Sequence, residues 1–269
     1  MRQWRLIYDA PARGAHNMAV DEAILAAVSA GAAPPTLRLY AWSPTCLSLG
    51  YGQKSTDADL QRIAQLGWDV VRRPTGGRAI LHAAELTYSV SLPADHSLAA
   101  NGILDNYRQI NHALMAGLAL IGLAPQSERQ SYRRPSPNPA CFHTLSHYEI
   151  TVEGRKLVGS AQLRRRGAVL QHGSLPLSGD LGRICDGLSY PDEASREQAK
   201  SHMRTRAITL VEALGKEIYW STVADAVVQG FESCLGITFR RGRLSESEQS
   251  HATQLARQVY SNIDRRAVT

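Results

Sequence analysis

A thiol and an amine stand fifteen residues apart in this chain and could together carry acyl-transfer chemistry. Cys141 follows a loop-like run, SPNPA at 136–140, and Lys156 lies in GRKLVGSA at 154–161. A thiol is mostly protonated at pH 7, so a nucleophilic cysteine requires a nearby positive charge or base. If the two side chains meet, the ammonium of Lys156 lowers the pKa of the Cys141 thiol and helps to hold an acyl carbonyl. The alternative is a buried, inert thiol, the commonest fate of a free cysteine, although a loop position argues against it.

The other three cysteines offer no second nucleophile. Cys46, Cys185 and Cys234 stand in ordinary packing contexts. The four cysteines form no C-x-x-C pair and show no Cys/His spacing typical of zinc sites. We therefore expect neither a metal nor a cofactor.

The stretch RRPTGGRAILH at 72–82 places a proline, two glycines and three arginines between apolar runs that read as strands. Glycines where strands meet permit positive φ angles and let a ligand approach main-chain N–H groups. An ordinary turn is the alternative, because Pro-Thr-Gly-Gly is good turn chemistry by itself. Four histidines near these motifs could act as general bases; they are His82, His143, His147 and His172.

The two segments together resemble the lipoate/octanoate-protein transferase and ligase family, which has the biotin/lipoate protein ligase fold, through RRxxGGxAxxH at 72–82 and GRKxxGSA at 154–161. Further similar segments lie at 17–23, 47–53 and 170–175. A cysteine upstream of the lysine hairpin resembles the octanoyltransferases that act on the glycine cleavage H protein. The ATP-using ligases share both motifs but generally lack this cysteine, and they usually show an acidic residue directly after the loop histidine, where this chain has Ala-Ala-Glu at 83–85.

The resemblance implies roles for individual residues. Cys141 and Lys156 would be catalytic. His82 would close the loop that contains Gly76 and Gly77, here called the glycine loop, and would shape the pocket. A narrow apolar tunnel for a medium-chain acyl group would be formed by the remaining residues of the two motifs. These acyl-binding residues are Arg73, Gly76, Gly77, Arg78, Gly159, Ser160 and Ala161.

We therefore predict an octanoyltransferase that takes octanoyl from octanoyl-acyl carrier protein onto Cys141 and passes it to a lysine of a lipoyl-accepting protein of the glycine cleavage H protein type. Thioester-to-amide transfer is downhill, so ATP is not required. An ATP-dependent lipoate-protein ligase is an alternative, since arginines and glycine N–H groups could hold phosphates. The cysteine and the lack of room for an accessory domain argue against it. An amidotransferase acting between lipoyl domains would use similar residues.

The chain carries a formal net charge of +6 and has a pI near 9.3, with runs such as Arg164-Arg165-Arg166. Such a pI is one criterion for nucleic-acid-binding proteins, so a non-catalytic, nucleic-acid-binding role is a second class of function. The arginine runs lack interleaved aromatic residues, which argues against single-strand binding. A solvated basic face is the usual explanation of such a run. We prefer a third interpretation, in which a basic rim steers acidic carrier and acceptor proteins and no nucleic acid binds.

Length and composition favour one α/β (α+β) unit, a mixed, largely antiparallel sheet flanked by helices. With 269 residues, 43% of them hydrophobic, the chain can bury one substantial core. We expect a single domain over 1–269, with 177–269 a helical C-terminal part packed on it. No signal peptide and no apolar stretch long enough for a bilayer are visible, so we expect a cytoplasmic monomer without membrane contact.

Hydrophobic periodicity and turn signals predict the elements in order. Helices are expected at 17–28, 57–66, 104–120, 223–235 and 245–260, and strands at 37–42, 46–51, 68–71, 79–81, 87–90, 148–152, 156–162 and 168–175, the last three as an antiparallel meander.

Overall fold

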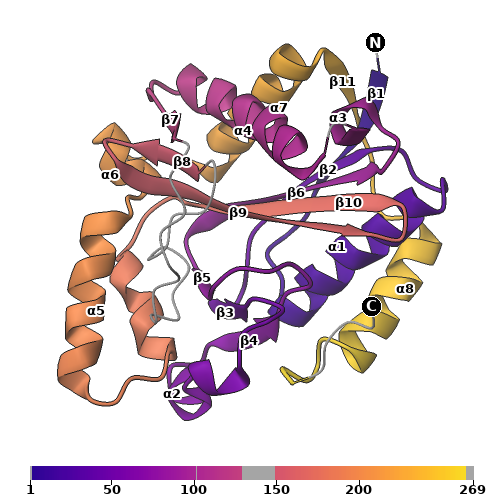
Figure 1. Cartoon of the computed structure of the whole chain (residues 1–269). Helices are drawn as coiled ribbons and strands as arrows, with labels where there is room; N and C mark the ends of the chain where they lie inside the picture. The colour runs from indigo at the N-terminus through magenta and orange to yellow at the C-terminus, as the bar shows by residue number, and fades with distance from the viewer. Residues whose placement is uncertain (1, 101, 129–148, 265–269) are drawn as a thin grey trace.

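The computed structural model describes residues 2–100, 102–128 and 149–264. Its centre is an eight-stranded sheet in the order β11-β1-β2-β6-β10-β9-β8-β7 (Figure 1). Strand β1 pairs parallel with both β11 and β2, and all other neighbours are antiparallel, which confirms the predicted mixed, largely antiparallel sheet. The strands are β1 (Arg2–Tyr8), β2 (Thr36–Tyr40), β6 (Glu85–Pro93), β7 (Gln126–Glu128), β8 (Glu149–Val152), β9 (Arg155–Arg165), β10 (Ala168–Pro176) and β11 (Ile237–Arg241).

The predicted meander forms strands β8, β9 and β10, and tight turns set its register. Glu153 and Gly154 have φ angles of 51° and 71° at the turn between β8 and β9. Positive φ at both central residues suits the right-handed twist of paired strands. The turn holds Lys156 opposite Thr151 of β8, next to a register shift between Ile150 and Thr151.

Helices cover both faces of this sheet (Figure 1). Helices α4 (Ile103–Leu120) and α7 (Trp220–Leu235) pack on one face, where they bury the largest hydrophobic cluster. A Cβ at Gly230 of α7 would overlap backbone atoms of α4, so glycine permits their close packing. Helix α1 (Gly14–Ser29) packs on the other face, helix α8 (Glu246–Gln258) packs against α1, and a capping box from Ser245 begins α8.

A smaller three-stranded sheet lies on the α1 side of the large sheet (Figure 1). Its order is β4 (Asp69–Arg72), β3 (Cys46–Leu49), β5 (Ile80–His82). A second hydrophobic cluster packs it against helical segments from both halves of the chain. The remaining helical elements are η1 (Ser55–Asp57), α2 (Leu60–Gln65), α3 (Ser97–Ala100), η3 (Leu181–Gly187), α5 (Glu193–Arg206) and α6 (Leu210–Leu214).

The C-terminal part departs from the purely helical prediction at one element. Strand β11 follows α7 and pairs parallel with β1, with Ile237 opposite Arg2. The predicted helices at 223–235 and 245–260 correspond to α7 and α8. Of the helices that the structure describes, none combines the length and the apolar character needed to cross a bilayer.

Candidate functional site

A narrow cavity lies between the large sheet and the small one. Four of the predicted acyl-binding residues line it: Arg73, His82, Gly159 and Ala161. Its apolar wall comes from Met18 of α1, Tyr40 and Trp42 near the end of β2, and Ile80 of β5. Apolar walls with few polar groups are typical of small-molecule sites, so this cavity is the candidate acyl site. We refer to it as the acyl cavity.

Strand alternation separates the predicted tunnel residues. Gly159 and Ala161 of β9 face the cavity, whereas Ser160 between them is not among its lining residues. The Ser160 hydroxyl lies 2.7 Å from the hydroxyl of Tyr88, and the Ser160 carbonyl accepts a hydrogen bond from Tyr107 of α4. Ser160 therefore belongs to the packing between the sheet and α4.

Arg73 binds the glycine loop with its buried guanidinium. Only 3% of Arg73 is exposed, and it donates to the carbonyl oxygens of Gly76, Arg78 and Ser48 at 2.7–3.2 Å. Gly76, Gly77 and Arg78 form the loop and do not line the cavity. The loop crosses so close to β3 that a Cβ at Gly50 would overlap the carbonyl oxygen of Gly77.

His172 of β10 joins two sides of the cavity. Its Nδ1 lies 3.1 Å from Oδ2 of Asp21 in α1, and its Nε2 lies 2.6 Å from Oγ1 of Thr75 in the glycine loop. Burial lowers the pKa of His172, and the neighbouring Asp21 opposes this only in part. The imidazole is therefore neutral at pH 7, donating from Nδ1 to Asp21 and accepting from Thr75 at Nε2.

Asp21 of α1 is a buried carboxylate that accepts hydrogen bonds from several buried side chains. Its Oδ1 accepts from Arg38 at 2.8 Å, and its Oδ2 accepts from Tyr40 at 2.9 Å. Burial alone would raise the pKa of Asp21, but the hydrogen bond from His172 and the charge of Arg38 outweigh it, so the pKa is lowered. Asp21 lies in the 17–23 segment that resembles the family, yet sequence reasoning assigned it no role.

His82 of β5 makes a second carboxylate–imidazole–hydroxyl chain. Its Nδ1 lies 2.8 Å from Oε1 of Glu85, and its Nε2 lies 2.8 Å from Oγ of Ser48. Trp42 stacks on the ring with centroids 3.9 Å apart and an interplanar angle of 11°. The sequence analysis noted Glu85 three residues after the histidine but gave it no role; Glu85 reaches His82 because the chain turns between β5 and β6.

Lys156 is completely buried and forms an ion pair with Glu149. The two residues lie on the adjacent strands β9 and β8, so the hairpin turn brings them together. A buried carboxylate compensates the charge of an ammonium that has lost its water shell. Lys156 does not line the cavity. Its predicted catalytic partner Cys141 lies outside the described residues, as do His143 and His147.

The two buried cysteines, Cys46 and Cys185, are poor nucleophiles. Burial, reinforced by the charges of Asp69 and Glu85, raises the pKa of Cys46 far above its usual value. Burial also raises the pKa of Cys185, whose sulfur accepts a hydrogen bond from Tyr190. Within residues 2–100, 102–128 and 149–264, no group of three His, Cys, Asp or Glu side chains is arranged to hold a metal ion.

Comparison with known proteins identifies the relatives of this chain. The family model of the lipoyl protein ligase A/B catalytic domain matches residues 13–232. Octanoyltransferase LipM of Symbiobacterium thermophilum is 41% identical over 263 residues, covering 96% of this chain and 95% of the relative. Octanoyltransferase LipM of Exiguobacterium sibiricum is 39% identical, covering 97% of each.

Two solved structures share the fold over nearly the whole chain. The bipartite lipoate protein ligase of Thermoplasma acidophilum superposes with a TM-score of 0.82 at 26% identity, covering 97% of this chain and 95% of its own. A lipoate-protein ligase A bound with ATP gives 0.80 at 26% identity, covering 98% of each chain. The curated relatives confirm the prediction of an acyl-transferring enzyme of the octanoyltransferase kind. By its family model and by these relatives, this chain belongs to the lipoyl protein ligase A/B catalytic domain family.

Proposed function

We propose that this protein transfers an octanoyl group from octanoyl-acyl carrier protein to its own Cys141 and then to a lysine of a lipoyl-accepting protein of the glycine cleavage H protein type. The observation that carries the proposal is the identity of about 40% to octanoyltransferases over nearly the full length of both chains. The proposal includes action as a cytoplasmic monomer, without nucleotide or metal.

The transfer takes two balanced steps. In the first, the Cys141 thiolate attacks the donor thioester carbonyl, a new C–S bond forms, and the carrier thiolate leaves and takes up a proton. In the second, the neutral amine of the acceptor lysine attacks the Cys141 thioester. The C–N bond forms, the C–S bond breaks, and the amine proton ends on the Cys141 sulfur.

The cavity supports this chemistry with an apolar wall and fixed polar groups. Met18, Trp42 and Ile80 provide surface for an alkyl chain, and the small side chains of Gly159 and Ala161 leave it room. Lys156 does not line the cavity, and we propose that it places a positive charge near the oxyanion that develops at Cys141. Glu149 holds that ammonium in place before the acyl group arrives.

ATP-dependent lipoate ligation is the second candidate, because the lipoate-protein ligase A bound with ATP covers 98% of this chain. Its phosphate clamp would rely on the arginines of the 72–82 segment. Arg72 and Arg73 are buried and already donate to backbone carbonyls, Arg72 to those of Gly50 and Gln53. This arrangement favours the ATP-independent reaction.

Intact mass spectrometry tests the choice. The protein is incubated with octanoyl-acyl carrier protein in the absence of ATP, then treated with hydroxylamine. We expect an adduct of octanoyl mass that hydroxylamine removes, that persists in Cys234→Ala, whose thiol is exposed, and that is absent in Cys141→Ala. Transfer that appears only with ATP and free lipoate would establish the ligase. An acyl-enzyme loaded only from an octanoylated lipoyl domain would establish an amidotransferase.

A further inference from the structure

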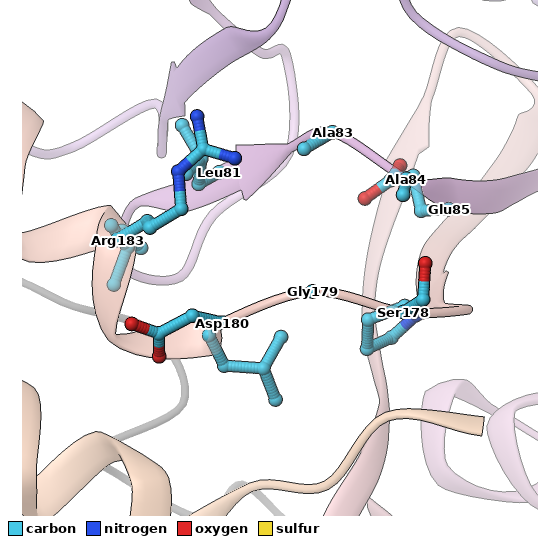
Figure 2. A pocket seen from close by; sticks show the side chains of 11 residues that line it. Leu81, Ala83, Ala84, Glu85, Ser178, Gly179, Asp180 and Arg183 are labelled. Carbon is cyan, nitrogen blue, oxygen red and sulfur yellow. The ribbon is translucent and has the colours of Figure 1, made fainter. Parts of the chain in front are cut away.

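A second cleft opens beside the acyl cavity, between the turn that follows β5 and the segment that follows β10 (Figure 2). Its sides are largely apolar and include Leu81, Pro176 and Ile184. Glu85 and Ser178 lie at one end of the cleft, and Asp180 and Arg183 lie at the other (Figure 2). The cleft therefore combines apolar walls with a carboxylate and a hydroxyl at one end.

Glu85 retains capacity for one more donor. It is only 3% exposed, and it accepts hydrogen bonds from His82 and Thr87 at Oε1 and from Ser174 at Oε2. A carboxylate offers about four acceptor positions, so one position on Oε2 is left. Among the described residues, no lysine or arginine forms an ion pair with Glu85. The hydrogen-bond donors to this buried carboxylate are an imidazole and two hydroxyls. A bound cation would compensate the buried negative charge.

Glu85 also connects the cleft to the acyl cavity. Its three hydrogen-bond donors, His82, Thr87 and Ser174, all line the acyl cavity, while Glu85 itself lines the cleft. A group bound at Oε2 would therefore lie one side chain away from the acyl site. Ser178 faces the same end of the cleft (Figure 2), and its hydroxyl makes no hydrogen bond with any residue that the structure describes.

We propose that this cleft receives the acceptor lysine, with its methylene groups along the apolar walls and its ammonium on Oε2 of Glu85 and the hydroxyl of Ser178. The inference rests on the proposed acyl transfer and adds the subsite that recognises the second substrate as an ammonium, before the ammonium releases a proton to solvent and the neutral amine attacks. An amide-bearing arm of the donor could also enter a cleft of this shape. A lysine fits better, because the buried group at its end is a carboxylate and a charged donor forms the stronger hydrogen bond.

The test isolates the second half of the reaction. Octanoyl is loaded onto Cys141, the donor is removed, and the rate of single-turnover transfer is followed against the concentration of an acceptor lipoyl domain. In Glu85→Gln we expect the half-saturating acceptor concentration to rise about tenfold, the effect of losing one charge-assisted hydrogen bond. Hydroxylamine, a small neutral nucleophile, should still discharge the same acyl-enzyme. The matched control is Glu197→Gln, an exposed carboxylate paired with Lys200, which should match the wild type.

The outcomes separate this inference from the proposed function. If the wild type forms no acyl-enzyme, the proposed function fails and this subsite loses its substrate. If the acyl-enzyme forms and Glu85→Gln saturates with acceptor like the wild type, only the lysine subsite is overturned.

A second variant covers the case in which Glu85→Gln does not fold or does not load. Ala84 is exposed and lines the cleft, so Ala84→Lys would place a tethered ammonium beside Glu85. We expect it to lower the second-order rate of acceptor transfer about tenfold relative to Ala84→Gln, which adds similar bulk without charge. Equal rates for these two variants would overturn the proposal.

Discussion

The imidazole Nε2 of His172 lies 2.6 Å from the hydroxyl oxygen of Thr75, so strand β10 of the large sheet is joined directly to the glycine loop. Asp21 holds the other ring nitrogen of His172. His82 repeats the arrangement with Glu85 on its Nδ1. Two carboxylate–imidazole–hydroxyl chains therefore set the separation of the two sheets around the acyl cavity.

Thr75→Val removes the hydroxyl from the first of these chains without changing the shape of the side chain much. The buried Nε2 of His172 would then lack its donor, which costs about 1–3 kcal/mol of unfolding free energy. We expect urea denaturation to show this loss. Thr253→Val is the control, because the exposed Thr253 hydroxyl donates to the carbonyl of Gln249 in its own helix and to no other described residue. Equal stability of the two variants would show that the contact between His172 and Thr75 contributes nothing.

Stability should depend on pH through His172. Burial lowers the pKa of this imidazole in the folded state, while the unfolded chain has a pKa of about 6.5. The unfolded state therefore binds the proton more readily. The contribution of His172 is fully present above about pH 6.5 and is lost as the pH falls towards the lowered folded-state pKa.

The measurement is the unfolding free energy of the wild type and of His172→Gln between about pH 5 and 8, a range that brackets the unfolded-state pKa. The wild type should lose more stability than the variant below about pH 6.5, because only the wild type has this titrating group. Parallel curves for the two proteins would contradict a neutral, buried His172.

Local sequence patterns predicted the elements whose residues alternate or repeat clearly. The helix expected at 17–28 is α1, and the meander from 148 to 175 forms strands β8 to β10. Helix α5 was missed because only two of its three buried side chains, Ala199 and Met203, are apolar, too few to show a helical period in the sequence. Strand β11 was missed because its partner β1 lies at the other end of the chain, and no local pattern encodes that pairing.

The site was predictable where motifs supply the residues and unpredictable where distant strands supply them. Arg73, His82, Gly159 and Ala161 line the cavity, whereas Ser160 of the same motif does not, and their acyl-binding role stays a prediction. Asp21 stands 151 residues from His172, and only the folded sheet brings the two together. The predicted role of Cys141 stays a prediction, since it lies outside the described residues.

Glu149→Gln should destabilise the protein strongly. The buried ammonium of Lys156 would lose the carboxylate that compensates it, and breaking one side of a buried pair typically costs about 3–5 kcal/mol. Glu212→Gln is a suitable control because Glu212 pairs with Arg155 at the surface, where such pairs contribute about 0–1 kcal/mol. The check is urea denaturation of both variants. A loss no greater than that of the control would mean that Glu149 does not hold the Lys156 charge.

Gly50→Ala tests whether the glycine loop must lie directly against β3. A Cβ at Gly50 would overlap the carbonyl oxygen of Gly77, a backbone atom that can move only with the whole loop. The displaced loop would also pull Thr75 from His172, so the acyl cavity would lose one of its walls. We expect acyl-enzyme formation with octanoyl-acyl carrier protein to fall at least about fivefold, as a backbone shift of this kind costs about 1 kcal/mol or more. Gly52→Ala provides a matched control two residues away, because beyond its chain neighbours no described residue lies within 4 Å of the added methyl group. If Gly50→Ala formed the acyl-enzyme as fast as Gly52→Ala, contact between this loop and β3 would not be needed to shape the acyl site.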